Sequence, residues 1–213
     1  MNTPRIVFWD GSDPRVLNEA LAVLRQGAIL VLPTDTVYGM AADPRVTGAE
    51  QRLCQAKGRP EDKPIPLLTA NCAQIERWPA RLGPVARALA KRYWPGALTL
   101  VLPAGNGWEG FRIPDHAAAQ AVLSAVGGAL RVTSANRSGS APALTAKAAA
   151  ETLGGAVELV LDTGPAPGGR PSTVVQIGET TITILREGAI PGREIIKMHR
   201  ELMRDRPETL NRR

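Results

Sequence analysis

The stretch LPTDTVYGM, residues 32–40, directly follows an apolar run, Ala28 to Val31, that predicts a buried strand. A plain turn needs Gly, Pro, Asn or Asp, and it has no need of two hydroxyls and a phenol within five residues. Polar groups at the end of a buried strand in an α/β chain lie where such folds bind ligands. The stretch therefore predicts a ligand-binding strand end. An ordinary strand-to-loop transition with a capping Thr is the alternative that this segment alone leaves open.

Outward from this stretch, helical periodicity alternates with short apolar runs. Asp13 and Pro14 are typical of a helix start, Thr145 caps a later helix, and Thr47 with Glu50 predicts a capping box. We expect helices over 14–26, 47–56, 84–93, 117–126, 145–153 and 193–203, and strands over 28–32, 65–68, 97–102, 110–113, 129–132, 157–162, 174–177 and 181–185. This order predicts a single α/β domain with a twisted, mixed, open sheet flanked by helices.

The length and the charge limit the domain organisation and the class of ligand. A chain of 213 residues suits one domain, which we place at residues 1–190, with a basic C-terminal helix or tail at 191–213. The net charge of +6 favours anionic ligands such as nucleotides, RNA or phosphate groups. Residues 193–213 carry seven Lys and Arg against four Asp and Glu, which fits either contact with RNA or a partner, or a solvated chain end.

Other classes of protein are disfavoured by what the sequence contains. Cys54, Cys72, His116 and His199 form no paired metal-ligand motif, so we expect no structural zinc site. The chain shows no signal peptide and no run of eighteen apolar residues, so we expect no membrane association. Together with the low cysteine count, this predicts a cytoplasmic location.

Polar or basic clusters stand at the ends of several predicted elements. They are Thr34 with Thr36 and Tyr38, Lys57 with Arg59, residues 133–139, residues 168–173, Arg112 and Arg186. Each has a structural alternative, such as cations that satisfy helix-end carbonyls, a polar turn, a flexible loop or a solvated arginine. Together they predict one polyanionic small molecule bound along one rim of the sheet. Because no Ser-His-Asp set is present, the chemistry should depend on positioning and charge stabilisation, as in phosphoryl and nucleotidyl transfer.

The clusters extend into seven motifs that occur in order between Gly27 and Gly188. They are PTDTVYG (33–39), KGRP (57–60), WPGALT (94–99), RIPDH (112–116), SANRSG (134–139), STVV (172–175) and LREG (185–188). In this series the chain resembles the YrdC/Sua5 family, whose members make threonylcarbamoyl-adenylate for the modification of tRNA. The resemblance implies a YrdC-like domain with a concave basic cleft, in the short single-domain form.

The resemblance also implies an L-threonylcarbamoyladenylate synthase, which joins L-threonine, bicarbonate and ATP and releases pyrophosphate. The implied ATP-binding residues are Lys57, Arg59, Ser134, Asn136 and Arg186, and the implied threonine-binding residues are Thr34, Arg112 and Ser172. It implies Mg²⁺ on the ATP phosphates, with no metal ligand from the protein and no assigned catalytic residue, and Lys57 and Arg59 then stabilise charge.

Several positions depart from the family pattern. Asp35 stands where members often carry Glu, and many members have a His near the position of Leu68. Many also have a Thr in the stretch that corresponds to residues 106–110, and Pro is usual where Ala97 stands. The implied partners beyond the substrates are tRNA, through a basic surface, and a downstream threonylcarbamoyl-transferase complex. Two alternatives stay open. One is an RNA-binding or ribosome-maturation module that uses the basic concave face, although only eight aromatic residues are available for base stacking. The other is a carbamoyl-transferring maturation enzyme, although the zinc-type cysteine sets usual in that class are absent.

Overall fold

The computed structural model describes residues 3–179 and 181–204, whose strands form one mixed ten-stranded sheet in the order β1-β8-β2-β3-β7-β4-β6-β5-β9-β10. The strands are β1 (Arg5–Phe8), β2 (Leu30–Leu32), β3 (Gly39–Ala42), β4 (Leu67–Leu68), β5 (Leu98–Ala104), β6 (Gly107–Arg112), β7 (Leu130–Ser134), β8 (Leu159–Asp162), β9 (Thr173–Ile177) and β10 (Ile182–Arg186). The helices are α1 (Pro14–Arg25), α2 (Ala49–Lys57), α3 (Cys72–Ile75), α4 (Pro84–Tyr93), α5 (Ala117–Val126), α6 (Ala146–Leu153) and α7 (Gly192–Arg204), with a 3₁₀ turn η1 (Gly154–Ala156).

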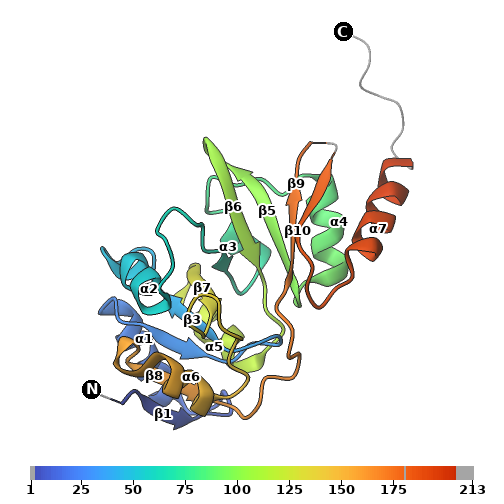
Figure 1. The fold of residues 1–213 in the computed structure, drawn as a ribbon. Helices are drawn as coiled ribbons and strands as arrows, with labels where there is room; N and C mark the ends of the chain where they lie inside the picture. The colour runs from blue at the N-terminus through green and yellow to red at the C-terminus, as the bar shows by residue number, and fades with distance from the viewer. Residues whose placement is uncertain (1–2, 180, 205–213) are drawn as a thin grey trace.

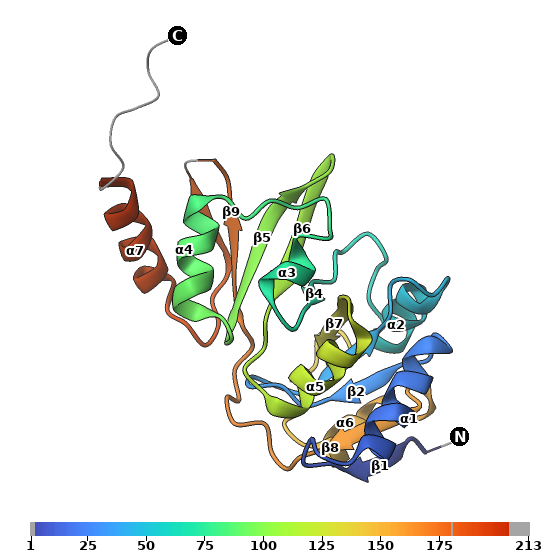
Figure 2. The same cartoon turned by 180° about the vertical axis from the view of Figure 1, so that it is seen from behind.

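The two-residue strand β4 divides the sheet into two parts (Figure 2). We call β1, β8, β2, β3 and β7 the first half-sheet, and β6, β5, β9 and β10 the second half-sheet. β4 pairs with β7 in antiparallel and with β6 in parallel orientation, so it is the only strand that joins the two halves within the described chain. Parallel pairs such as β2–β8 and β5–β9 stand beside antiparallel pairs such as β2–β3 and β9–β10, which confirms the predicted mixed sheet.

Each half-sheet builds its own core. α2 and α6 cover one face of the first half-sheet, and α1 and α5 cover the other, as a comparison of Figures 1 and 2 shows. Alanines dominate the buried face of α6, whereas the buried face of α5 combines two alanines with Val122 and Leu123. α3, α4 and α7 cover one face of the second half-sheet, where Leu89 and Ile195 are fully buried. Among the described residues, no helix covers the opposite face of the second half-sheet (Figure 1).

Local sequence signals explain most helix starts. The Asp13 carboxylate accepts a hydrogen bond from the Arg15 backbone N–H at 2.9 Å, and Thr145 Oγ1 accepts one from the Ala148 N–H at 3.1 Å, so both predicted caps are confirmed. The predicted capping box at Thr47 is wrong. α2 begins two residues later, and its N-cap is Gly48 at φ 77°, which supplies no side-chain oxygen. β1, β3 and α3 were not expected from the sequence.

α7 packs onto the second core through Ile195, so this part of the predicted C-terminal appendage contacts the body of the protein. The remainder of that predicted tail, residues 205–213, lies outside the described residues. None of the helices in the described chain is both long and apolar enough to cross a membrane. The domain boundary at residue 190 stays a prediction.

Candidate functional site

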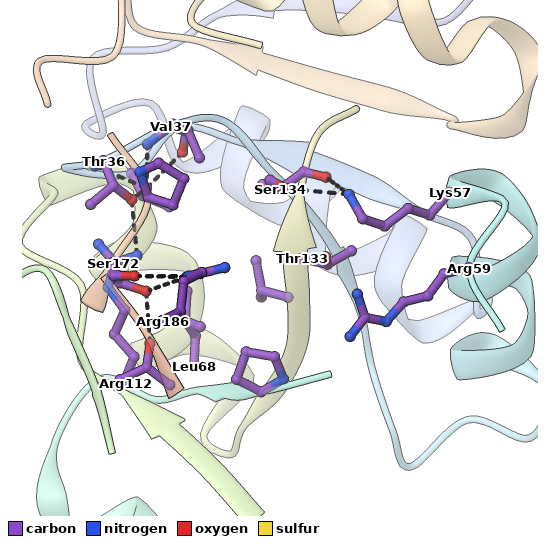
Figure 3. Close-up of a pocket in the computed structure, with 16 residues that line it drawn as sticks. Thr36, Val37, Lys57, Arg59, Leu68, Arg112, Thr133, Ser134, Ser172 and Arg186 are labelled. Carbon is purple, nitrogen blue, oxygen red and sulfur yellow. Dashed lines mark hydrogen bonds between the residues drawn. The ribbon is translucent and has the colours of Figure 1, made fainter. Parts of the chain in front are cut away.

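A pocket with a cavity volume of about 160 Å³ lies where the two half-sheets meet around β4 (Figure 3). It is lined by Thr34, Thr36, Val37, Gly39, Lys57, Arg59, Pro66, Leu68, Thr99, Arg112, Val132, Thr133, Ser134, Pro171, Ser172 and Arg186. Lys57 and Arg59 lie on one side of this pocket, and Arg112, Ser172 and Arg186 lie on the other. Seven of the eight residues predicted to bind ligands therefore come together, and Asn136 is the exception.

Lys57 is the last residue of α2, and Gly58 follows it in the left-handed conformation at φ 64°, which ends the helix. The side chain is 5% exposed. Its ammonium donates to the carbonyl oxygens of Ser134 at 2.7 Å and Asn136 at 3.1 Å, and to Asn136 Oδ1 at 2.9 Å. Burial, with a smaller contribution from the charge of Arg59, lowers the pKa of Lys57 to about 8.

Two arginines add charge to the same pocket. Arg59 follows α2 and is held by the carbonyl oxygens of Lys63 at 3.3 Å and Pro64 at 3.0 Å. Arg186, the last residue of β10, donates to the Ser172 carbonyl at 2.7 Å, and burial and then the charge of Arg59 lower its pKa. The lining contains no Asp or Glu. Within residues 3–179 and 181–204, no carboxylate forms an ion pair with Lys57, Arg59 or Arg186, so the pocket holds excess positive charge.

Arg112 differs from these three cations because it is neutralised. Its Nη2 pairs with Asp35 Oδ1 at 2.5 Å, its Nη1 donates to Thr36 Oγ1 at 2.9 Å, and its Nε donates to the Gly96 carbonyl at 2.9 Å. Burial lowers the pKa of Arg112, and the Asp35 carboxylate opposes that shift. These partners fix the plane of the guanidinium at the end of β6. Asp35 itself does not line the pocket.

Three residues of the predicted clusters have structural contacts that the sequence did not show. The Thr34 hydroxyl donates to the Val37 carbonyl at 2.6 Å and accepts from the Thr36 N–H at 3.2 Å, so it shapes the β2–β3 loop while lining the pocket. Tyr38 lies outside the lining, fully buried, and its hydroxyl donates to the Gly164 carbonyl at 2.6 Å. Asn136 also lies outside the lining, and its Oδ1 accepts a hydrogen bond from the Lys57 ammonium.

The hydroxyls of the second half-sheet form a short network. Ser172 Oγ lies 2.8 Å from Thr99 Oγ1, and Arg186 Nη2 donates to Ser172 Oγ at 3.1 Å. Sequence reasoning did not single out Thr99, although a threonine inside the apolar strand LTLVL is a signal that could have found it. It also gave no role to Val37, which stands in the opening stretch.

The fold and the pocket define an α/β protein with a cation-lined pocket between its two half-sheets. A family model for Sua5/YciO/YrdC proteins, described as "Telomere recombination", matches residues 22–188. The threonylcarbamoyl-AMP synthase of Bacillus subtilis is 35% identical over 195 residues, covering 86% of this chain and 56% of that protein. A putative threonylcarbamoyl-AMP synthase of Mycobacterium leprae is 37% identical over 196 residues, covering 85% of this chain and 89% of that protein.

Similarity extends to solved structures. Pyrococcus abyssi Sua5, whose structure was solved in complex with L-threonine, superposes with a TM-score of 0.84 at 32% identity, over 90% of this chain and 59% of that one. The chain belongs to the Sua5/YciO/YrdC family. It spans less than two thirds of the B. subtilis and P. abyssi proteins.

Proposed function

We propose that this protein is a threonylcarbamoyl-AMP synthase, a nucleotidyltransferase that converts L-threonine, bicarbonate and ATP into threonylcarbamoyl-AMP and pyrophosphate. The observation that carries the proposal is the set of three cations, Lys57, Arg59 and Arg186, that line one pocket without a carboxylate partner among the described residues. A triphosphate supplies the matching charge. The names of the relatives and the threonine complex of P. abyssi Sua5 support the same reaction.

The two sides of the pocket suit the two larger substrates. Lys57 and Arg59 bind the ATP phosphates beside Ser134, and Arg186 approaches the nucleotide from the opposite side. Arg112 binds the carboxylate of threonine through the guanidinium hydrogens that Asp35, Thr36 and Gly96 leave available. Thr34 and Ser172 lie beside this position, and Ser172 stands where the two substrates meet.

In the proposed reaction, the threonine amine captures bicarbonate as a carbamate with loss of water. A carbamate oxygen then attacks the α-phosphorus of ATP, and the bond to pyrophosphate breaks. The protein positions the substrates and places positive charge along the departing phosphates. These two contributions require no general base from the chain. ATP would bring Mg²⁺ on its phosphates, and the carboxylate-free lining fits a metal held by phosphate and water rather than by the protein.

The test is pyrophosphate release with all three substrates, compared with reactions that lack threonine or bicarbonate. We expect release to require both. Lys57→Met should reduce turnover by at least 100-fold, because the variant loses the buried charge next to the phosphates. Lys147→Met is the matched control, since Lys147 lies on the exposed surface of α6. Release that does not depend on threonine, or full activity of Lys57→Met, would contradict the proposal.

The comparisons do not favour the alternative of an RNA-binding or ribosome-maturation module, because the curated relatives carry the name of the synthase. Delivery of the product to a threonylcarbamoyl-transferase complex acting on tRNA follows from the proposed reaction as a further part of the proposal. The cytoplasmic location stays a prediction.

A further inference from the structure

A second hollow, which we call the α3–α4 groove, lies between α4 and the start of α3 (Figure 2). Its cavity volume is about 390 Å³, against about 160 Å³ for the cation-lined pocket. Leu82, Ala90 and Ile113, which are all buried, line it together with the half-buried Trp94 and Cys72. The groove is therefore mostly apolar, and the proposed reaction gives it no role.

Two cations stand at the rim of this groove. Arg87 and Lys91 are exposed and lie four residues apart on α4, so they share one face of the helix. Within the described part of the chain, Lys91 forms no ion pair, and Arg87 pairs only with the exposed Glu76, at 3.3 Å. None of the described residues that line the groove is acidic. The rim therefore carries positive charge that a bound anion can match.

The apolar lining and the cationic rim together select a class of ligand. The volume lies in the range of small-molecule sites, about 300–1,000 Å³. An apolar body gains free energy by leaving water for the lining and the indole of Trp94, and an acidic group on the same molecule meets Arg87 and Lys91. Inorganic phosphate lacks the apolar body, and a neutral hydrocarbon leaves the rim charge unmatched. A nucleic-acid backbone likewise offers no apolar group for the lining.

The groove shares a wall with the cation-lined pocket. Arg112 lines the pocket and Ile113, the next residue, lines the groove, because successive residues of an extended chain point to opposite sides. The Gly96 N–H donates to the Ile113 carbonyl at 2.8 Å, and the Gly96 carbonyl accepts from Arg112 Nε at 2.9 Å. Trp94 and Pro95, directly before Gly96, line the groove. A molecule in the groove therefore contacts the turn that holds the Arg112 guanidinium.

We propose that the α3–α4 groove binds a small organic anion with an apolar body, and that this binding is coupled to the binding of threonine at Arg112. The site stands on its own geometry, whereas the coupling rests on the proposed function. An occupant that favours one position of the Trp94–Gly96 turn alters the hydrogen bond from Arg112 to Gly96. By linkage, threonine and the anion then change each other's Kd by the same factor.

Cys72 provides a local measurement of binding. The chain has two cysteines; Cys54 is 3% exposed, whereas Cys72 is half-buried and lines the groove. Labelling of Cys72 by N-ethylmaleimide, followed by mass spectrometry, should slow as 1-naphthoate is added, and the concentration dependence gives the Kd. Acetate has the charge without the apolar body, and 1-naphthalenemethanol has the body without the charge. We expect 1-naphthoate to bind at least about tenfold more tightly than acetate and about fivefold more tightly than the alcohol.

Two double variants that remove the same charge locate the anion. Arg87→Gln/Lys91→Gln keeps good helix formers and should weaken the binding of 1-naphthoate about fivefold. The control, Arg25→Gln/Lys147→Gln, changes two exposed cations outside the groove and should bind like the wild type. Saturating L-threonine should change the wild-type Kd for 1-naphthoate by at least about fivefold.

The site and the coupling fail in different ways. Labelling of Cys72 that 1-naphthoate does not slow would overturn the site, and so would an equal Kd for the two double variants. A Kd for 1-naphthoate that threonine leaves unchanged, in protein that shows threonine-dependent pyrophosphate release, would overturn the coupling. Failure of the proposed function is separate, because it appears as the absence of that release.

Discussion

If Lys57 binds the ATP phosphates as proposed, its lowered pKa makes ATP binding dependent on pH. Burial and the nearby charge of Arg59 hold this pKa at about 8, whereas an exposed lysine titrates near 10.5. The ammonium is therefore charged at pH 7 and mostly neutral at pH 9. A bound triphosphate stabilises the charged form and raises the pKa again. By linkage, affinity for ATP must fall as the pH rises above the pKa of the free protein.

The size of the effect follows from the fraction of Lys57 that is protonated. With a pKa of about 8, roughly ten elevenths of the molecules carry the charge at pH 7 and roughly one eleventh at pH 9. If the bound form titrates well above pH 9, Kd should weaken about tenfold between these values, or about 1.4 kcal/mol. At pH 8, binding should also take up about half a proton.

Titration calorimetry with ATP in the absence of threonine measures both quantities, since the substrate amine then does not titrate. Proton uptake is obtained at pH 8 from two buffers of different ionisation enthalpy. Lys57→Arg is the matched variant, because a guanidinium stays charged throughout this range and should remove the pH dependence. A wild-type Kd that is constant from pH 7 to 9, with no proton uptake at pH 8, would refute the reasoning. The same tenfold weakening in Lys57→Arg would also refute it.

Three further predictions concern stability, measured by urea unfolding. Gly168→Ala should lower the free energy of unfolding by about 1–3 kcal/mol, because the added Cβ would overlap the Asp35 carbonyl oxygen. The control Gly83→Ala, whose Cβ would meet no atom within 4 Å, should lower it by under about 1 kcal/mol. Equal unfolding midpoints of the two variants would contradict this prediction. Tyr38→Phe should lower the free energy of unfolding by about 1–3 kcal/mol, because the Gly164 carbonyl loses its hydrogen-bond donor. The Kd for ATP should not change, since Tyr38 does not line the pocket. A weaker affinity for ATP would show that the phenol acts in the pocket. Asp35→Asn should cost about 3–5 kcal/mol, since the buried Arg112 charge loses its counter-ion, and an unchanged midpoint would argue against that pairing.

Local chemistry made much of the fold predictable. Pro14 and Gly27 bound the first helix because proline fits a helix start and glycine a helix end. Where local signals compete, the sequence misled: Gly48 took the cap position from Thr47 because glycine adopts the left-handed conformation that this turn requires. β3 was missed because it begins at Gly39, directly after polar residues that indicate a loop, and the pairing that makes it a strand is with β2 and β7.

For the site, element ends were the useful signal, because cations and hydroxyls at those positions do meet in one pocket. The hydrogen bonds of each side chain could not be predicted, since they depend on tertiary contacts. Arg112 and Asp35 are 77 residues apart, and Lys57 and Asn136 are 79 residues apart. The sequence therefore predicted which residues gather, but not that Asn136 supports Lys57 from outside the pocket.

The short pairing of the two half-sheets through β4 has a consequence for the stability of the protein in the cell. Only two residues of β4 connect the ladders of the two halves, while the pocket draws Lys57 from one half and Arg186 from the other. An anion that contacts both cations links the two half-sheets and stabilises their arrangement. Ligand at 100 times its Kd adds about 2.7 kcal/mol to the stability of the folded state. If the anion is the proposed ATP, the lifetime of the protein should follow the nucleotide supply, because proteases cleave the less stable unliganded form first.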